Sequence, residues 1–542
     1  MSTGTAVRGI KPGTKVLIAD ALNERGAAII KEGGLAADTR PGLSEAQLCE
    51  IIGEYDGLIV RSATTVTRKI IEAGKKLQII GRAGVGVDNI DQKAATEAGI
   101  IVQNTPLGNI TSAAEHAIAL LFAVARNVAR ADKEMKAGKW NKKGLTGVEL
   151  TGKVLGVIGM GKVGAVVARV GQALDMTILV YDPYVTDKKA EELGVSKRDL
   201  DALLRESDFV SIHTPLTPET RNLITLDKLK LMKKTARLIN AARGGIVSEE
   251  ALCEALKSGI IAAAGLDVFE KEPLAADSRL RALESIVLTP HLGASTTEAQ
   301  ERVAEDIAKQ FVEFFRDGVI RNAVNLPVSP DSKLAPYARL AEMLGSMVAQ
   351  MAKEPVARLK VGVYGKLAAG DTRELNLCAL KGLLSRSSGN TVTLVNAPGL
   401  AEARGIELAE HKSDQVRTYA NLIIATGEMA GSGGEKRECV VAGTCFDGQA
   451  ARIVRINDYE IDLKPAPLIL LMFYPDRPGM VGKIGTILGE ANINIGNMAV
   501  GRREKRGQAA VALTLDDPAS PEVLERIRQA ISVEDMFAIQ LQ

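Results

Sequence analysis

The chain has 542 residues, which at about 100–200 residues per domain predicts three or four domains. Its 68 Lys and Arg residues nearly balance its 66 Asp and Glu residues, and the formal net charge of +2 argues against a dedicated nucleic-acid-binding protein. Hydrophobic residues make up 46%, enough for several buried cores, whereas aromatic residues make up only 3%, too few for base-stacking surfaces. This composition is that of a globular protein and not of a disordered or fibrous chain.

Cysteine and histidine usage argues against disulfide and metal chemistry. The five cysteines are scattered without a C-x-x-C pair, and only four histidines occur, so neither a disulfide framework nor a zinc site is expected. The first residues, MSTGTAVRGIKPGTK, lack the apolar region of a signal peptide. Apolar runs such as Ala117–Ala125 fall short of the roughly 18 residues that a membrane span needs. We therefore expect a reduced, cytoplasmic protein with no membrane segment and no metal.

Short Val/Ile/Leu runs alternate with helical patterns through the first half of the chain, which is typical of parallel sheets built from βαβ units. The first series predicts strands at 15–20, 57–62, 77–82 and 99–104. A long amphipathic helix is expected over 111–138, with Thr111 or Ser112 as its cap and Glu115 completing a capping box. The second series predicts strands at 153–158, 177–182, 209–214, 237–242, 263–268 and 286–291, before a helix over 296–317. Two series joined by two long helices predict two doubly wound lobes.

A dinucleotide-binding pattern stands in the second series. The strand at 154–158 is followed at once by Gly159-Met160-Gly161-Lys162-Val163-Gly164, then by a helical pattern and a strand that ends in Asp182. The glycines permit a tight turn, close approach of a pyrophosphate and close helix–strand packing, while the helix N-terminus favours phosphate. Asp182 can accept hydrogen bonds from ribose hydroxyls and repel a 2′-phosphate. The pattern therefore predicts NAD in preference to NADP.

Three polar residues follow other strands of the same series: Arg243 in NAARGG, Glu272 in LDVFEKEP and His291 in LTPHLGAS. Ligands of open α/β sheets bind outside the carboxyl ends of the strands, so these three can meet in one cleft. An imidazole beside a carboxylate is an acid/base unit, and a guanidinium can grip a substrate carboxylate. Each residue alone is more simply explained by packing or solvation, and the spacing by itself leaves both explanations open.

The segments VGVIGMGKVG, HTPLTPETRNLI, NAARGGIV, LDVFEKEP and LTPHLGAST together resemble the D-isomer-specific 2-hydroxyacid dehydrogenase family. GLIVRSATTVT, GRAGVGVDNID and NTPLGNITSAAEHAIALL most resemble its long-form D-3-phosphoglycerate dehydrogenase branch, which carries two added C-terminal domains. The resemblance covers essentially the whole chain. It implies that His291 is the general base, Glu272 its carboxylate partner and Arg243 the anchor of the substrate carboxylate and oxygen.

The resemblance also implies the residues around these three. The substrate cleft would be lined by Arg61, Ser62, Arg82 and Asn109, with the two arginines suited to a phosphate dianion. The NAD contacts would be Val85, Gly159, Gly161, Lys162, Val163, Gly164, Asp182, Thr214, Ala241, Ala242, Arg243, Asp267, His291, Leu292, Gly293 and Ala294. His213 is expected on the cofactor side or in packing, and His116 in the core. Trp140 falls in a segment that crosses the dimer in relatives.

Beyond a proline-rich break at 325–336, the chain continues with two smaller units. The last unit resembles an ACT domain, a β-α-β-β-α-β module that senses amino acids. Tyr474, Asp476, Asn492 and Asn494 match its ligand-contacting positions, although a role in dimerisation alone stays open. We expect an α/β protein with a flavodoxin-like substrate lobe at 1–108 and 298–326 and a Rossmann NAD lobe at 109–297. Two α+β domains follow, an intervening domain at 330–464 and the ACT domain at 467–542.

The predicted activity is NAD-dependent oxidation of D-3-phosphoglycerate, the entry step to serine, in a homodimer or homotetramer with L-serine as the possible effector. Two alternatives remain open at this stage. A hydroxypyruvate or glyoxylate reductase would use the same scaffold on a substrate without phosphate. An NAD-sensing corepressor-like protein can retain the same catalytic set, although the ACT-like segment favours a metabolic enzyme.

Overall fold

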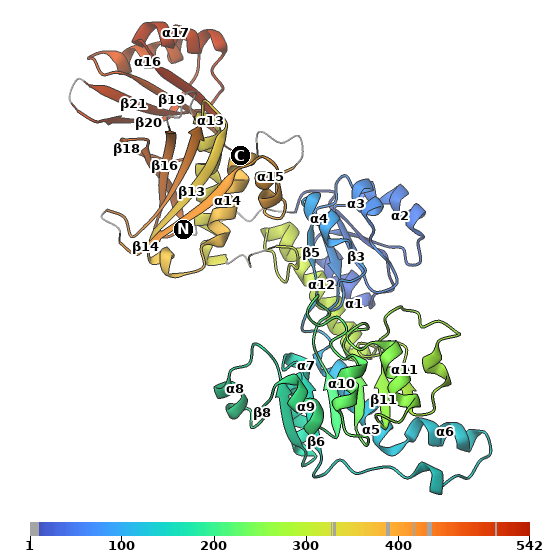
Figure 1. Cartoon of the computed structure of the whole chain (residues 1–542). Helices are drawn as coiled ribbons and strands as arrows, with labels where there is room; N and C mark the ends of the chain where they lie inside the picture. Colours follow the sequence, from blue (N-terminus) through green and yellow to red (C-terminus); the bar gives the residue numbers. More distant parts are fainter. Residues whose placement is uncertain are drawn as a thin grey trace.

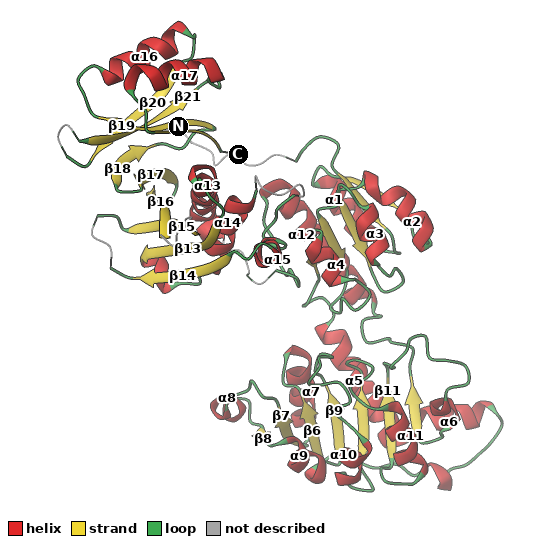
Figure 2. Ribbon diagram, turned by 45° about the horizontal axis from the view of Figure 1, so that its top comes forward, coloured by secondary structure: helices red, strands yellow, loops and turns green. Residues whose placement is uncertain are grey.

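The computed structural model describes residues 10–326, 328, 332–385, 391–415, 418–430, 436–504 and 507–541. Within these ranges the chain forms four sheets that follow one another through the molecule (Figures 1 and 2). No helix among the described residues is long and apolar enough to cross a membrane. The predicted α/β architecture, with two parallel-sheet lobes and two smaller α+β units, is confirmed.

The first sheet is parallel, and its strand order β2-β1-β3-β4-β5 is the flavodoxin-like order. Its strands are β1 (Lys15–Ile18), β2 (Ala36–Thr39), β3 (Gly57–Val60), β4 (Ile79–Arg82) and β5 (Ile101–Gln103). Its own helices are α1 (Glu24–Glu32), α2 (Glu45–Ile51), α3 (Arg68–Ala73) and α4 (Gln92–Glu97).

This lobe is completed by a helix from much later in the chain, α12 (Thr297–Asp317). The buried residues Val303, Ile307 and Phe311 recur every four positions and form one apolar stripe of α12. A Cβ at Gly81 of β4 would lie 2.4 Å from the Phe311 ring, so the glycine allows the helix to pack directly on the sheet. The chain therefore leaves this lobe, builds the next one and returns.

The second sheet is parallel with the order β12-β11-β10-β9-β6-β7-β8, which contains the Rossmann strand order. Its strands are β6 (Val154–Ile158), β7 (Thr177–Tyr181), β8 (Ser196–Lys197), β9 (Phe209–Ile212), β10 (Arg237–Asn240), β11 (Ala263–Leu266) and β12 (Ile286–Leu288). Its helices are α5 (Ile110–Arg126), α6 (Val128–Lys136), α7 (Lys162–Ala173), α8 (Asp187–Glu192), α9 (Leu200–Glu206), α10 (Leu226–Leu231) and α11 (Glu249–Lys257).

Three sequence predictions about local structure are wrong. The single helix expected over 111–138 is broken at Asn127, whose φ of 54° is left-handed, so α5 ends there and α6 begins. The expected cap at Thr111 or Ser112 is also wrong, because α5 begins after Asn109 and Ser112 donates instead to the carbonyl of Gly293 (2.8 Å). The predicted strands also ran a few residues too far.

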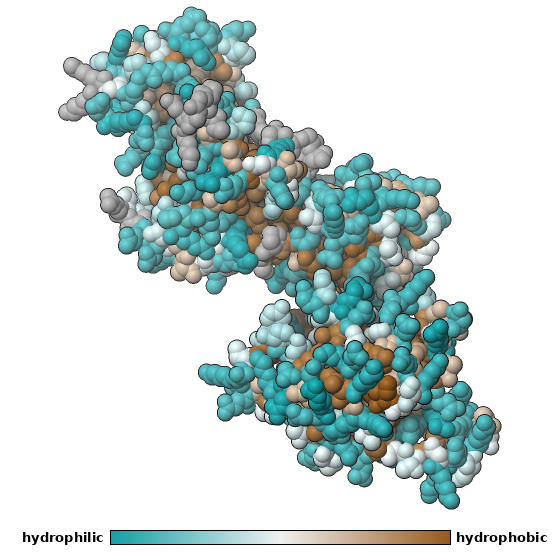
Figure 3. All heavy atoms as spheres, viewed as in Figure 1, coloured by the Kyte–Doolittle hydropathy of each residue, from teal (hydrophilic) through white to brown (hydrophobic). Residues whose placement is uncertain are grey.

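The third sheet is mixed, in the order β14-β13-β15-β16-β17-β18, with only β13 and β14 parallel. Its strands are β13 (Val356–Gly365), β14 (Glu407–Ser413), β15 (Asn421–Ala430), β16 (Lys436–Phe446), β17 (Ala450–Ile456) and β18 (Tyr459–Leu463). Its helices are α13 (Ala335–Met351), α14 (Arg373–Leu384) and α15 (Ala397–Ala403). In Figure 3 hydrophobic side chains are visible over parts of this unit and of the second lobe, while most of the visible surface is hydrophilic.

The fourth sheet is antiparallel and has the ferredoxin-like order β22-β19-β21-β20. It comprises β19 (Leu468–Pro475), α16 (Met480–Glu490), β20 (Ile495–Arg502), β21 (Gln508–Leu515), α17 (Pro521–Ile531) and β22 (Asp535–Gln540). The residues of β19 alternate between two cores: Leu470 and Met472 face α16 and α17, whereas Leu471 and Phe473 join the core of the third unit. The last two units thus share one hydrophobic core.

Candidate active site

The three predicted catalytic residues come together at the carboxyl edge of the second sheet, facing the first lobe. Strands β10, β11 and β12 are neighbours, and Arg243, Glu272 and His291 each lie in the loop that follows one of them. Several strands end earlier than predicted, which moves predicted site residues out of the strands. Just past strand ends lie Arg61, Asp182, Thr214 and Asp267, in the loops where ligands of open α/β sheets bind.

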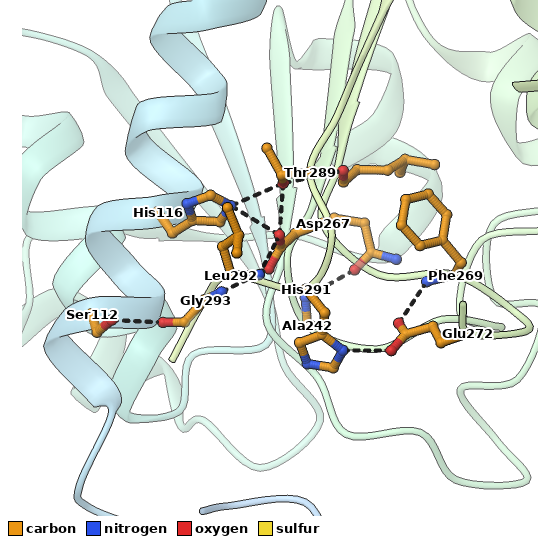
Figure 4. Close-up of polar contacts among 12 residues, drawn as sticks. Ser112, His116, Ala242, Asp267, Phe269, Glu272, Thr289, His291, Leu292 and Gly293 are labelled. Atoms are coloured by element: carbon orange, nitrogen blue, oxygen red, sulfur yellow. Dashed lines mark hydrogen bonds and ion pairs between the residues drawn. The ribbon is translucent and has the colours of Figure 1, made fainter. Parts of the chain in front are cut away.

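His291 and Glu272 form a hydrogen-bonded pair, with 2.7 Å between His291 Nδ1 and Glu272 Oε2 (Figure 4). The other oxygen of Glu272 accepts from the backbone N–H of Phe269 at 3.0 Å. Burial acts to raise the pKa of Glu272, but the hydrogen bonds from His291 and Phe269 outweigh it and the pKa lies below its ordinary value. The carboxylate is therefore charged at neutral pH, where it holds the imidazole and stabilises its protonated form.

Arg243 reaches the boundary between the two lobes. Its Nε lies 3.3 Å from Asp88 Oδ2 of the first lobe, and its NH1 donates to the carbonyl of Ala242 at 2.7 Å. A Cβ at Gly86 would lie 2.3 Å from the Arg243 NH2 atom, so the glycine leaves room for the guanidinium. The planar guanidinium is thereby held beside the loop that follows β4.

Two further arginines share this region. Burial first, and then the charges of Arg243 and Arg61, lower the pKa of Arg82 to about 10. The Nε atom of Arg82 is buried without a hydrogen-bond partner. Gly84 lies so close that a Cβ there would collide with the Arg82 guanidinium, 1.5 Å from NH1. Two guanidinium groups that repel Arg82 form with it a site that an anion stabilises.

The other predicted substrate residues lie after β3 of the first sheet and at the start of α5. Arg61 donates from NH1 to the carbonyl of Ala21 (3.0 Å), and its neighbour Ser62 is exposed. Asn109 is the residue before α5, and its side chain makes no capping hydrogen bond to that helix. The carbonyl of Val85 accepts a hydrogen bond from the side chain of Asn104 at 2.6 Å, which fixes the turn between Gly84 and Gly86.

The glycines of the dinucleotide pattern have distinct conformational roles. Gly159 has a φ of 91°, and a Cβ at Gly164 would lie 2.0 Å from its carbonyl oxygen, so both positions require glycine. Nothing lies within 4 Å of the position of a Cβ at Gly161, which opens the N-terminus of α7. Lys162 and Val163 form the first residues of that helix. This arrangement fits the pyrophosphate of a dinucleotide.

Asp182 and Thr214 flank this turn. The two oxygens of Asp182 accept from the backbone N–H groups of Met160 (2.7 Å) and Tyr184 (2.8 Å), so the carboxylate is held beside the glycine turn. Thr214 follows β9, the neighbour of β6, and its hydroxyl is buried without a protein partner. A buried hydroxyl that lacks a partner in the protein fits a site that a ligand completes.

The remaining predicted cofactor residues lie on two loops. Ala241 and Ala242 are half-buried after β10, and Ala294 is half-buried after the exposed Leu292 and the buried Gly293. Asp267 is fully buried, and its side chain accepts from the N–H groups of Leu292 (2.7 Å) and Gly293 (2.8 Å). In this structure the carboxylate of Asp267 is therefore occupied in holding the loop that carries His291.

His116 is the functional candidate that sequence reasoning missed. Instead of lying in the core, its Nε2 is 3.0 Å from both Asp267 Oδ1 and Thr289 Oγ1. No local sequence signal marks this contact, because the helix and the loop are far apart in the chain and meet only through the fold. His213 hydrogen bonds Ser211 Oγ at 2.8 Å, and burial lowers its pKa to about 4.

The four residues predicted to bind an effector do not converge on an open pocket. Tyr474 is only 1% exposed and packs in the core beneath α16 and α17. Asp476 accepts from Arg502 (3.2 Å), and Asn494 donates to Asp516 (2.7 Å), so their polar groups are already paired. Asn492 is exposed, with a left-handed φ of 56°.

Three protein families match successive parts of the chain. The NAD-binding domain of D-isomer specific 2-hydroxyacid dehydrogenases matches residues 118–293. The D-3-phosphoglycerate dehydrogenase intervening domain matches residues 333–457, and the ACT domain matches residues 468–532.

Several curated relatives match over almost their whole length. The D-3-phosphoglycerate dehydrogenase of Synechocystis sp. is 44% identical over 97% of this chain and 95% of the relative. The protein of the same name from Archaeoglobus fulgidus is 42% identical over 97% of this chain and 100% of the relative. Among solved structures, the TT0316 protein from Thermus thermophilus has 35% identity and a TM-score of 0.53, and it covers 57% of this chain and 100% of its own.

Proposed function

This chain belongs to the D-3-phosphoglycerate dehydrogenases, a branch of the D-isomer specific 2-hydroxyacid dehydrogenases, and from this premise we propose which of its residues do the chemistry. The reaction is the NAD-dependent oxidation of D-3-phosphoglycerate to 3-phosphohydroxypyruvate, the first step of L-serine biosynthesis. The match extends through the intervening and ACT domains, and so favours this activity over a reductase without those domains or a corepressor.

We propose that His291 is the general base. Its Nδ1 is committed to Glu272, which leaves Nε2 to take the proton from the C2 hydroxyl of the substrate. The negative charge of Glu272 stabilises the imidazolium that forms. NAD⁺, when bound, supplies the acceptor for the hydride that leaves C2. The His291–Glu272 hydrogen bond is the observation that carries this assignment.

The anionic groups of the substrate have matching cations in the cleft. Arg243 is placed to grip the substrate carboxylate and to polarise the C2 oxygen, because its fork of N–H donors matches a carboxylate. We assign the phosphate to Arg61 and Arg82, which lie at the ends of the neighbouring strands β3 and β4, where the charge of Arg61 lowers the pKa of Arg82. Ser62 and Asn109 complete the predicted substrate side.

The direct test is an absorbance assay of NAD⁺ reduction by the purified full-length chain with D-3-phosphoglycerate, with D-glycerate in a parallel reaction. We expect NADH to form at catalytic rates with the phosphorylated substrate and at least about a hundredfold less efficiently with D-glycerate, because D-glycerate lacks the phosphate's charge-assisted hydrogen bond to each of Arg61 and Arg82, at about 1.5–3 kcal/mol each. Equal efficiency on the two substrates would remove the phosphate assignment. No turnover with either would remove the proposed residue roles.

We expect the Asp182→Asn variant to shift cofactor preference toward NADP⁺. The substitution keeps an oxygen acceptor beside Met160 N–H but removes the charge that repels a 2′-phosphate. The ratio of kcat/KM for NADP⁺ to that for NAD⁺ should rise by at least about tenfold, given that one charge contact exceeds about 1.4 kcal/mol. Asp187→Asn, which neutralises an exposed acid of α8, is the matched control and should leave the ratio unchanged.

We propose that the ACT domain binds an amino acid and that L-serine, the end product of the pathway, is that effector. The support is the family match at residues 468–532. Asp476 and Asn494 pair with exposed partners, and those partners can be exchanged for a ligand's ammonium and carboxylate groups. Repeating the NAD⁺ reduction assay with and without L-serine tests this assignment, and unchanged rates at millimolar L-serine would contradict it.

We also propose a homodimer or homotetramer that works in the cytoplasm. Helix α6 has no buried residue, and Trp140 beyond it is 82% exposed, so this segment has the character of a surface that a second copy covers. All five cysteines are free thiols, which suits a reducing compartment. The four-domain division at 1–108 with 298–326, 109–297, 330–464 and 467–542 is supported by the positions of the four sheets.

A further inference from the structure

The loop that carries His291 makes several hydrogen bonds to one buried residue, Asp267. Its backbone carbonyl accepts from the His291 N–H at 2.9 Å. Its carboxylate accepts from the Thr289 hydroxyl (2.6 Å) and from the N–H groups of Leu292 and Gly293. The hydrogen bonds lie on both sides of His291, so the position of the carboxylate sets the position of the imidazole.

Helix α5 contacts this arrangement from the other side of the loop. Figure 4 shows Ser112 and His116 on one face of the helix, directed at Gly293 and at Asp267. The ring of His116 is 18% exposed, and its Nε2 lies 3.0 Å from both Asp267 Oδ1 and Thr289 Oγ1. Because the Thr289 hydroxyl already donates to Asp267, the Nε2–H of His116 is the donor in both contacts.

A carboxylate that is completely buried needs such donors to remain charged. Burial acts to raise the pKa of Asp267, but the hydrogen bonds from His116, Thr289 and Leu292 outweigh burial and lower the pKa. His116 is the donor among these three that comes from outside the loop. His116 therefore connects the loop to α5, which is the first helix of the NAD lobe and follows directly after Asn109.

We infer that His116 is a positioning residue for hydride transfer, acting through Asp267 on the loop that holds His291. The inference rests on the role proposed above for His291. His116 does not reach the reacting atoms itself. It keeps the imidazole at the distance and angle at which it can take the substrate proton, and an error of about 1 Å in such a position can reduce the rate a hundredfold.

Two substitutions of His116 distinguish the loss of its hydrogen-bond donor from a change in side-chain size. His116→Leu removes the donor and keeps an apolar side chain on α5, whereas His116→Gln places an amide N–H near the position of Nε2. We expect kcat of His116→Leu to fall by about ten- to a hundredfold, while KM for D-3-phosphoglycerate stays within about twofold. The His116→Gln variant should recover to within about threefold of the parent.

Ser112→Ala removes the other contact of α5, to the Gly293 carbonyl, and provides a milder second variant with the same expected direction. Glu115→Gln, at an exposed position of the same helix, is the matched control and should behave as the parent. Thermal unfolding and NAD⁺ titration by fluorescence establish that each variant is folded, so that a loss of kcat is not a loss of folded protein.

The inference is overturned if folded His116→Leu keeps kcat within about twofold of the parent, or if His116→Gln is as impaired as His116→Leu. The proposed function fails differently. In that case the parent itself does not reduce NAD⁺ with D-3-phosphoglycerate, or His291→Gln remains active. An active parent, an inactive His291→Gln and an unaffected His116→Leu would reject only the inference about His116.

Discussion

Replacing His291 by glutamine is expected to lower kcat by about 10²- to 10⁴-fold, the usual loss when a general base is removed. Glutamine can still donate an N–H to Glu272, so the loop keeps its geometry, but the amide cannot accept the hydroxyl proton. Steady-state NADH formation gives kcat, and NAD⁺ titration by intrinsic fluorescence should give a dissociation constant within about threefold of the parent.

The partner residue sharpens this test. Glu272→Gln leaves the imidazole without the charge that stabilises its protonated form, so a loss of similar order is expected. Because the two residues act as one unit, the double variant should be no slower than His291→Gln alone. His411→Gln, far from the cleft in β14, is the matched control. The base assignment is wrong if His291→Gln retains more than about a tenth of the parental kcat.

Replacing Arg243 by glutamine is the second substitution with a large expected effect. Two charge-assisted hydrogen bonds to the substrate carboxylate, each contributing about 1.5–3 kcal/mol, would be lost. At about 1.4 kcal/mol for each factor of ten, kcat/KM for D-3-phosphoglycerate should fall by roughly 10²- to 10⁴-fold. The guanidinium also polarises the C2 oxygen, so both kcat and KM should change.

Arg243→Lys keeps the charge but loses the planar fork, and an intermediate kcat/KM is expected from it. Arg169→Gln, which removes an exposed guanidinium on α7, is the matched control. If Arg243→Gln raised KM for NAD⁺ alone and left the D-3-phosphoglycerate parameters unchanged, the guanidinium would belong to the cofactor side and the substrate would need another anchor.

Much of the fold was predictable because its signals are local. The glycines of the dinucleotide turn, the alternation of apolar runs and the acid at the end of β7 all lie close together in the chain, and the two parallel sheets follow from them. The pairing of His291 with Glu272 was expected from the family resemblance, because their spacing alone left it open. The fold brings them together since their strands, β11 and β12, are neighbours and their loops meet at one edge of the sheet.

The errors arise where a side chain is satisfied by a distant segment. Ser112 has the sequence context of a helix cap, but its hydroxyl donates to Gly293, and so α5 starts without it. His116 sits among alanines and leucines, yet its ring faces a buried carboxylate from another strand. Tyr474 matches a ligand-contacting position by sequence, but its ring lies in the core. None of these partners can be read from neighbouring residues.

The return of α12 to the first lobe has a consequence for the order in which the protein can fold during synthesis. Gly57 and Gly81 of the first sheet lie against the Phe311 ring, so that core stays open to solvent until α12 has left the ribosome. Residues are added at about 5–20 per second, so α12 becomes available only after the whole NAD lobe has been synthesised. The strands of the NAD lobe, in contrast, are contiguous in the chain. The NAD lobe can therefore be the first to reach its native state, although it comes second in the sequence. The face of the first sheet that α12 covers therefore stays exposed for that period.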